Sequence, residues 1–368
     1  MIQKDRLLKQ FFEFVGIGSE SGNEKAMGER LVRACRDLGL QVVTDNAGAS
    51  YGSNGFNVLA YLPGTMEGEP YLLSAHMDTV KPGNGIVPYI KDGVIMSGED
   101  TILGGDDKSG ICGILEAVQS VLEDGMPHRP AEILFSIGEE GGMRGAKAFD
   151  VSLLKSRRGY IFDSSGDVGK VIVGAPGQSK VSADVIGKRA HAGLAPETGI
   201  SAIQVMAKAI AKMNLLRIDE ETTCNIGEIH SEFATNIVPD RCHLFAEVRS
   251  RNLDKLNAQV AHMEQCLRDA CKEAGAELQF DPYTNYISYR VDPEGETVKT
   301  VLEALARMGI EPMVTLGGGG SDANIYNQKG IESVVLGTGM TKVHTTEETI
   351  TVENLCRTAV LVQELLTH

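Results

Sequence analysis

Residues 71–80, YLLSAHMDTV, join a short apolar run to a histidine and an aspartate. The run from Tyr71 to Leu73 predicts a buried strand. Side chains two apart share one face of a strand, so His76 and Asp78 are expected to project together from its carboxyl end. Open α/β sheets place their chemistry at that edge. The pair alone leaves three options open: a metal ligand with its orienting carboxylate, part of a nucleophilic triad, or a surface pair without function.

The segments around this strand alternate between strands and helices. Residues 108–125 have apolar side chains at helical spacing with a glycine at the end, and residues 131–140 and 159–166 predict two more strands. Residues 41–64 predict a hairpin, and Ser21 is expected to cap a helix over 22–38. This order predicts a mixed or parallel α/β sheet.

The pattern changes near residue 176. Alternating strands and two helices follow in the order β–α–β–β–α–β, which predicts a small two-layer domain with an antiparallel sheet. We therefore expect an α/β domain over residues 1–175 and 285–368, interrupted by a smaller α+β domain over residues 176–284. A length of 368 residues also favours two domains, because single cores stop growing at about 250–300 residues.

Charge and composition exclude some classes of partner. A net charge of −15 argues against nucleic acid and anionic membranes, because both require a basic surface. No apolar run reaches membrane-spanning length, and the first residues lack the apolar centre of a secretion signal. Seven cysteines without a CxxC pair favour reduced thiols and a cytoplasmic location.

Five short segments place histidines or carboxylates at expected strand ends or loops. They are residues 76–78, 104–108, 138–142, 162–164 and 343–347. Acidic side chains gathered at one sheet edge repel each other unless a cation compensates them. Imidazole with carboxylate is a zinc-type ligand set, with manganese or cobalt as alternatives. Two histidines and three carboxylates exceed the needs of one zinc, and two ions sharing a carboxylate would use all five.

Each segment alone also has a simpler interpretation. His-x-Asp occurs as a packing pair, Glu139 and Glu140 occur as solvated loop charge, and His344 would cap a helix that begins near Val352. The stretch GGDDKSG departs from a phosphate loop, because Asp107 replaces the glycine required before the lysine. The recurrence of all five segments at strand ends favours a metal centre.

The order HxD, GGDDK, GEE, D and H resembles the di-zinc exopeptidase family that contains peptidase T, aminoacylase and the bacterial glutamate carboxypeptidases. The resemblance covers nearly the whole chain, and GGDDKSG and FDSSGDVG are most similar to peptidase T and the tripeptidases. It implies a mixed-sheet catalytic domain with an inserted lid domain that forms a homodimer.

The resemblance also implies the ligands of two zinc ions. His76 would bind one metal and His344 the other, and Asp106 would bridge them. Glu140 and Asp163 would complete the two coordination spheres. The ions would be Zn²⁺, with Mn²⁺ or Co²⁺ as alternatives.

Two more residues would serve the chemistry. By the resemblance, Asp78 would hold the ring of His76 through a hydrogen bond, and a cis peptide would join Asp106 to the next residue. Glu139 would act as general base toward a metal-bound water and then protonate the leaving amine. Adjacent strand residues point apart, so Glu139 and Glu140 can differ in task only if the backbone turns, which the neighbouring glycines permit.

A third set of residues is implied to bind substrate. His191 resembles the lid histidine that reaches the active site of the partner subunit, and its alternative is a surface histidine. Asn236 and Arg249 resemble residues that bind the substrate backbone and carboxylate, and the alternative for Arg249 is a surface strand charge. The family's glycine loop, otherwise a flexible turn, would contribute Gly318, Gly319 and Ser321.

Sequence and resemblance together predict a cytoplasmic two-zinc aminopeptidase that releases the N-terminal residue of short peptides as a homodimer. The first alternative is a carboxypeptidase or N-acyl-amino-acid deacylase, which Arg249 cannot separate because all these substrates end in a carboxylate. The second is a binding module without catalysis. Loss of Glu139 or of a ligand would indicate it, and none is lost.

Overall fold

The computed structural model describes residues 1–98 and 100–368, and these form two compact units. The first unit comprises Met1–Gly174, Arg290–Gly317 and Ser321–His368. The second comprises Ala175–Tyr289 and Gly318–Gly320. The chain therefore leaves the first unit after its first 174 residues and returns to it to complete the fold. No helix among the described residues has both the length and the apolar character needed to cross a membrane.

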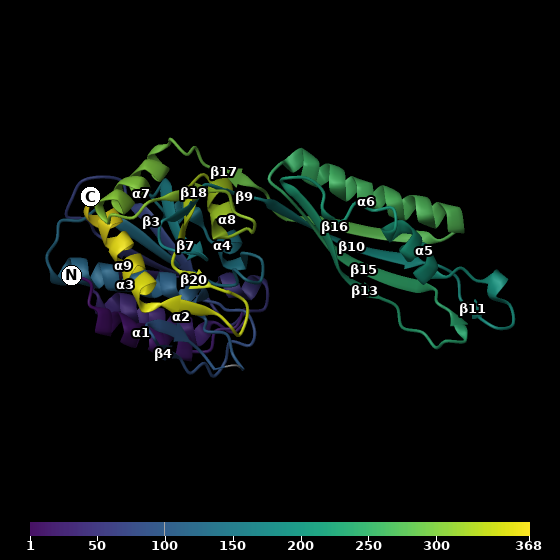
Figure 1. Ribbon diagram of the computed structural model, residues 1–368, viewed down its shortest axis with the longest axis horizontal. Helices are drawn as coiled ribbons and strands as arrows, with labels where there is room; N and C mark the ends of the chain where they lie inside the picture. The colour runs from purple at the N-terminus through teal and green to yellow at the C-terminus, as the bar shows by residue number, and fades with distance from the viewer. Residues whose placement is uncertain (99) are drawn as a thin grey trace. The chain divides into compact units, whose positions relative to one another are not determined.

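An eight-stranded sheet organises the first unit (Figure 1). β3 pairs in parallel with β6 and β7. β2 pairs antiparallel with β1 on one side and with β6 on the other. All of β3 is buried, as its apolar run predicts. The predicted mixed sheet and hairpin are confirmed. In order across the sheet, the strands are β1 (Gln41–Thr44), β2 (Val58–Leu62), β6 (Ala131–Ser136), β3 (Tyr71–His76), β7 (Arg158–Ser164), β19 (Glu332–Gly337), β8 (Lys170–Ile172) and β18 (Met313–Thr315).

Helices pack against this sheet through their apolar sides. α3 contacts β3 and β7, and both α1 and α9 contact α3 (Figure 1). α8 contacts β7 and β19, and α4 contacts α8. These helices are α1 (Lys4–Gly16), α2 (Lys25–Asp37), α3 (Gly105–Glu123), α4 (Arg144–Ala148), α7 (Glu296–Arg307), α8 (Asp322–Gln328) and α9 (Val352–Thr367). A smaller sheet contains β20 (Met340–Thr341), β21 (Thr349–Thr351), β5 (Val94–Met96) and β4 (Tyr89–Lys91), and β9 (Gly174–Ala175) pairs with β17 (Tyr289–Arg290).

The second helix begins later than predicted. α2 starts at Lys25, and its N-cap residue Glu24 makes no side-chain capping bond. The Ser21 hydroxyl donates to the buried Asp78 carboxylate at 2.6 Å. The prediction that Ser21 caps this helix is wrong, because a carboxylate distant in the sequence takes its hydroxyl.

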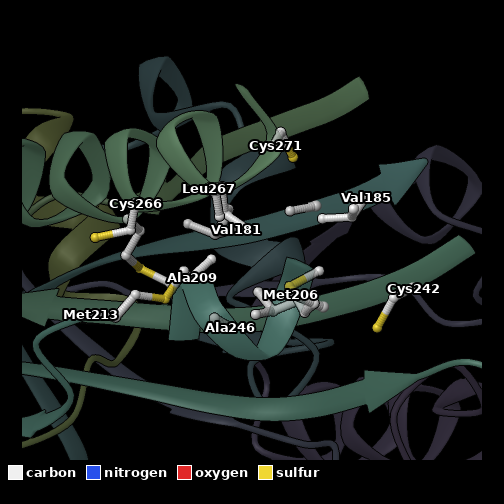
Figure 2. Packing of buried hydrophobic residues seen from close by; sticks show 14 of the residues in the cluster. Val181, Val185, Met206, Ala209, Met213, Cys242, Ala246, Cys266, Leu267 and Cys271 are labelled. Carbon is white, nitrogen blue, oxygen red and sulfur yellow. The ribbon is translucent and has the colours of Figure 1, made fainter. Parts of the chain in front are cut away.

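The second unit is a five-stranded antiparallel sheet packed against α5 and α6. Alternate residues of β15 are buried, which is the pattern of a sheet with one face on a core. Figure 2 shows Leu267 of α6 and Met206 of α5 in this core with Val181 of β10. The longer elements follow the predicted β–α–β–β–α–β order, and the structure adds three two-residue strands. The elements are β10 (Gly177–Ile186), β11 (Ala190–His191), α5 (Ala202–Ile210), β12 (Leu216–Arg217), β13 (Thr222–His230), β14 (Ile237–Val238), β15 (Arg241–Ser250), α6 (Leu253–Ala274) and β16 (Glu277–Tyr286).

Candidate metal centre

Three neighbouring strands bring their carboxyl ends to one edge of the large sheet. His76 is the last residue of β3, and Asp163 is the penultimate residue of β7. Glu139 and Glu140 follow the end of β6. Because β6, β3 and β7 run in parallel, these side chains gather at the same edge.

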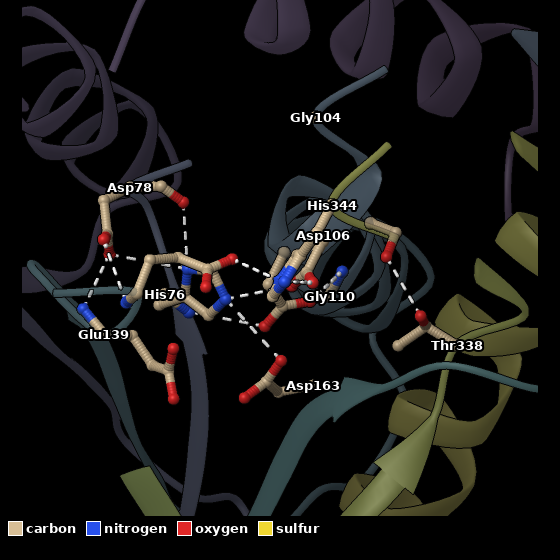
Figure 3. Close-up of polar contacts among 12 residues, drawn as sticks. His76, Asp78, Gly104, Asp106, Gly110, Glu139, Asp163, Thr338 and His344 are labelled. Atoms are coloured by element: carbon tan, nitrogen blue, oxygen red, sulfur yellow. Dashed lines mark hydrogen bonds and ion pairs between the residues drawn. The ribbon is translucent and has the colours of Figure 1, made fainter. Parts of the chain in front are cut away.

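Asp106 enters this edge from the start of α3. Gly104 has φ +70°, and Asp106 and Asp107 depart from helical geometry, so the chain turns sharply before the regular helix. The peptide between Asp106 and Asp107 is cis, as the resemblance implied. Asp106 Oδ1 lies 3.0 Å from His76 Nε2, and its Oδ2 lies 3.2 Å from His344 Nε2. One carboxylate therefore stands between two imidazoles, which is the placement required of a bridging ligand (Figure 3).

Each imidazole has a second carboxylate at its side. Asp163 Oδ1 lies 3.6 Å from His76 Nε2, and Glu140 Oε1 lies 2.9 Å from His344 Nε2. Possible ligand atoms of His76, Asp106 and Glu140 lie within 4.8 Å of one another. The structure thus brings together the five residues predicted as ligands, and their nitrogen and oxygen donors fit a pair of zinc-type ions.

Asp107 is a further carboxylate beside this group. Its ligand atom lies within 4.8 Å of those of His76 and Asp163. Its two oxygens accept the N–H of His76 at 3.3 Å and the N–H of Gly110 at 3.2 Å. Asp107 therefore joins the end of β3 to the first turn of α3, and it supports the geometry of its neighbour Asp106.

A sharp turn follows β6 at Glu139 and Glu140. Gly138 has φ +61°, and the Asp78 carboxylate accepts the N–H of Glu139 at 2.9 Å and of Glu140 at 3.2 Å. Figure 3 shows the Glu139 side chain reaching toward the same space as Asp163, below the ring of His76. The expected turn is present, and a single buried carboxylate holds it.

Asp78 contacts His76 in a different way from the one expected. The Nδ1 atom of His76 lies 2.9 Å from the main-chain carbonyl of Asp78 and 3.5 Å from its carboxylate. The carbonyl is thus the closer partner of the ring, because the carboxylate is occupied by Ser21 and the turn after β6. Asp78 still fixes the ring orientation, but mainly through its backbone.

Burial shifts three of the acidic groups, Glu139, Glu140 and Asp163, toward their protonated forms. Burial, followed by the charge of Asp163, raises the pKa of Glu139 well above its ordinary value. Burial likewise raises the pKa of Asp163 to about 7 and raises the pKa of Glu140. A glutamate whose pKa lies above the usual range is suited to proton transfer near neutral pH.

The pKa values of the two histidines are raised as well, but by neighbouring carboxylates and not by burial. Hydrogen bonds with Asp106 and Glu140 raise the pKa of His344 to about 10. Burial alone would lower the pKa of His76, but hydrogen bonds with Asp106 and Asp163 raise it well above the ordinary value. Metal ligation requires neutral imidazoles, so ion binding would release these protons.

Asp322 is a buried carboxylate that the sequence did not single out. It follows Ser321 at the start of α8, and its side chain is 2% exposed. One oxygen accepts the hydroxyl of Ser136 at the end of β6, and the other has no hydrogen-bond partner among the described residues. Burial raises the pKa of Asp322 to about 6. The only sequence signal was an aspartate two positions after a glycine run.

The residues expected to bind substrate belong to two places. His191 and Asn236 are exposed and lie together, because the N–H of Ala192 donates to the Asn236 carbonyl at 2.9 Å. His191 Nδ1 accepts the N–H groups of Gly193 and Leu194 at 3.2 Å, so the neutral ring carries its proton on Nε2.

Arg249 is already paired within the second unit. Its Nε and Nη2 donate to the Glu247 carboxylate at 2.8 and 3.2 Å. A side chain on Gly319 would lie 3.9 Å from Nη1 of Arg249, and one on Gly320 would overlap the ring of Tyr286. The glycine run therefore lets the backbone pass close to the Arg249 region.

Gly318 and Ser321 complete the predicted loop. A side chain on Gly318 would meet nothing within 4 Å, so this glycine borders open space. The Ser321 hydroxyl caps α8 by accepting the N–H of Ala323 at 3.3 Å, and Asn324 completes a capping box. The structure thus gives the Ser321 side chain a structural task.

A mixed α/β unit that presents two imidazoles, three carboxylates and a separate glutamate at one sheet edge defines a metal-dependent hydrolase. The sequence model of peptidase family M20/M25/M40 matches residues 72–368, and the chain belongs to this family of metallopeptidases. This confirms the family that the motifs predicted.

Similar proteins cover the whole chain. Uncharacterized protein YqjE of Bacillus subtilis (strain 168) is 39% identical over 366 residues, which span 100% of this chain and 99% of that protein. The crystal structure of aminopeptidase PepT from Bacillus cereus ATCC 10987 has 42% sequence identity and a TM-score of 0.92, covering 100% of this chain and 98% of that one. The crystal structure of a tripeptidase from Staphylococcus aureus has 39% identity and a TM-score of 0.96, with the same coverage.

Proposed function

We propose that the protein is a metal-dependent aminopeptidase that removes the N-terminal residue from short peptides such as tripeptides. The observation that carries this proposal is the Asp106 carboxylate between His76 and His344, with Glu139 beside them. The similarity to an aminopeptidase and a tripeptidase, each over the whole chain, supports the same activity.

The proposed cofactor is a pair of Zn²⁺ ions, with Mn²⁺ or Co²⁺ as substitutes. His76 and Asp163 would hold one ion, His344 and Glu140 the other, and Asp106 would bridge them. The mixed nitrogen and oxygen donors support zinc. Bound metal would supply a water that is acidic near neutral pH and would polarise the scissile carbonyl.

We assign the proton transfers to Glu139. It takes a proton from the attacking water and gives it to the leaving amine, and burial supports this role because it raises the pKa of Glu139 above that of an ordinary glutamate. Asp78 orients this glutamate by accepting the N–H groups of Glu139 and Glu140. It also fixes His76 through its carbonyl, so one residue orients the base and a ligand.

Substrate contacts are proposed for the second unit and the glycine run. Arg249 would bind the peptide carboxylate, Asn236 its backbone, and Gly318 and Gly319 would offer main-chain atoms; Ser321 contributes by fixing the end of this loop. His191 would act in the active site of a partner subunit, which requires a homodimer formed through this unit.

A cytoplasmic location is proposed as well. The seven cysteines are free thiols, six of them buried. Buried reduced cysteines are typical of proteins in a reducing compartment.

The test compares a free tripeptide with its N-acetylated counterpart, using protein stripped of metal and then reloaded with Zn²⁺ or Mn²⁺. We expect cleavage of the free tripeptide only, and only after reloading. Cleavage of the acetylated peptide instead would assign the protein to the carboxypeptidase or deacylase alternative. Inactivity on both, with two metals bound, would indicate a binding module.

A further inference from the structure

Glu348 is a buried acidic residue outside the proposed ligands. Its side chain is 1% exposed, and it lies four residues after His344. Oε2 accepts the N–H of Leu103 at 3.0 Å and of Gly104 at 2.8 Å, and Oε1 accepts the N–H of Asp106 at 2.9 Å. One carboxylate therefore binds three main-chain groups in the segment that presents Asp106.

This segment has irregular backbone. Gly104 has a positive φ and Asp106 is not helical, so their N–H groups lie outside the regular hydrogen bonds of α3. Buried N–H groups require an acceptor, and Glu348 supplies it. A Cβ atom on Gly105 would lie 3.0 Å from Glu348 Oε1, so the glycine allows the carboxylate to approach this closely.

The same residue is anchored to the segment that carries His344. The N–H of Glu348 donates to the Thr345 carbonyl at 3.1 Å, which closes the turn after His344. His344 itself has φ +65°, a conformation that a non-glycine residue keeps only when its surroundings fix it. Glu348 thus joins the turn of His344 to the segment of Asp106.

We propose that Glu348 is a positioning residue that sets the separation between the Asp106 carboxylate and the His344 imidazole. This inference rests on the proposed function, in which these two side chains share a metal ion. The carboxylate of Glu348 binds the segment of Asp106, and its main-chain N–H binds the turn of His344. Asp106 Oδ2 and His344 Nε2 lie 3.2 Å apart between these two attachments. The Glu348 carboxylate binds main-chain N–H groups, so in this role it would act through Asp106 and His344 and not as a ligand itself.

Glu132 offers a matched control for a merely structural role. It is 2% exposed and also accepts main-chain N–H groups, from Lys155 at 2.9 and 3.0 Å and from Ser156 at 2.9 Å. None of these partners is a proposed ligand. Glu347, the exposed neighbour of Glu348, pairs with Lys342 and controls for the loss of a surface charge.

The experiment uses the metal-loaded wild-type protein and its Glu348→Gln, Glu132→Gln and Glu347→Gln variants. Glutamine keeps the volume but places an NH₂ group against an N–H donor, so at least one of the three bonds is lost. Metal affinity is measured by competition with a chelator, the absorption spectrum is recorded after Co²⁺ substitution, and thermal unfolding is followed for each protein.

We expect Glu348→Gln to weaken metal affinity about 10- to 100-fold, as for other groups that orient metal ligands, and to change the Co²⁺ spectrum. Glu132→Gln should lower the unfolding temperature but leave metal affinity and the Co²⁺ spectrum at wild-type values. Glu347→Gln should leave all three measurements at wild-type values. Glu348→Asp keeps the charge on a shorter side chain, and it should give a Co²⁺ spectrum different from wild type even if the glutamine variant fails to fold.

Wild-type metal affinity and an unchanged Co²⁺ spectrum in both Glu348 variants would overturn this inference and leave the proposed function intact. Failure of the wild-type protein itself to bind metal would overturn the proposed function first, and this inference with it.

Discussion

The two units treat ionisable side chains in opposite ways. Every buried acidic or basic side chain within residues 1–98 and 100–368 belongs to the first unit. The second unit has a core of aliphatic residues, methionines and cysteines (Figure 2). Its charges form pairs near the surface, such as Arg241 with Asp184. The buried groups of the first unit are Glu24, His76, Asp78, Asp106, Asp107, Lys108, Glu116, His128, Glu132, Glu139, Asp322 and Glu348.

This difference separates two ways of specifying a fold. Burying a charge is costly unless a partner compensates it, so a concentration of buried charges indicates chemistry or a bound ion. The second unit needs only the alternation of apolar and polar residues. The first unit needs that alternation and also a set of specific polar contacts.

The largest expected effect is at the proposed general base. Glu139→Gln removes the proton acceptor but keeps the volume, so we expect a loss in kcat of about 10²- to 10⁴-fold with both metals retained. Tripeptide cleavage and metal content are measured together. The same substitution at the exposed Glu277 of the second unit should leave kcat unchanged. Near-normal turnover of the Glu139 variant would remove this residue from the mechanism.

The next prediction tests whether the two cores are independent. Leu73 of β3 and Leu267 of α6 are both fully buried, so replacing either by alanine should cost about 2–5 kcal/mol of unfolding free energy. Leu73→Ala should also weaken metal binding, because its strand ends in His76. Leu267→Ala should not. Chemical denaturation and metal titration report the two effects, and equal loss of metal affinity in both variants would contradict the contrast.

A smaller effect is expected at Arg249. Arg249→Ala should raise KM for a tripeptide about 10- to 100-fold, which corresponds to the loss of one hydrogen bond between charged groups. Metal affinity should not change. Glu247→Gln should have less effect, since it only orients the guanidinium. Steady-state kinetics on the free tripeptide measure both, and an unchanged KM for Arg249→Ala would exclude it from substrate binding.

The smallest effect is expected at the surface pair of the second unit. A hydrogen bond from Arg241 lowers the pKa of Asp184, so its stabilisation is present above the unfolded-state value of about 3.9 and is lost as the pH falls through the lower folded-state value. Asp184→Asn should cost less than about 1 kcal/mol at pH 7, because solvent screens the pair. Denaturation at pH 7 and pH 2.5 measures this cost, and a cost that grows toward acid would contradict the assignment.

The sequence predicted the sheets and the grouping of the five proposed ligand residues, because both follow local patterns or motifs. It did not predict that the Ser21 hydroxyl donates to the Asp78 carboxylate and does not cap α2. It also could not distinguish Glu347 from Glu348 in the run TTEET. Only the second is buried, and its bond to Asp106 spans 242 positions in the sequence. Polar contacts of this kind depend on the finished tertiary structure and have no local signal.

The strand order of the large sheet also constrains how the chain folds as it is synthesised. β19 lies between β7 and β8, although the whole second unit is translated before it. All strands of the second unit have left the ribosome while β7 still lacks this neighbour. Domains usually fold in the order of synthesis, but here the inserted unit has its complete sheet first. Until β19 arrives, the nascent first unit exposes an unpaired apolar strand edge, which is a site for aggregation or chaperone binding.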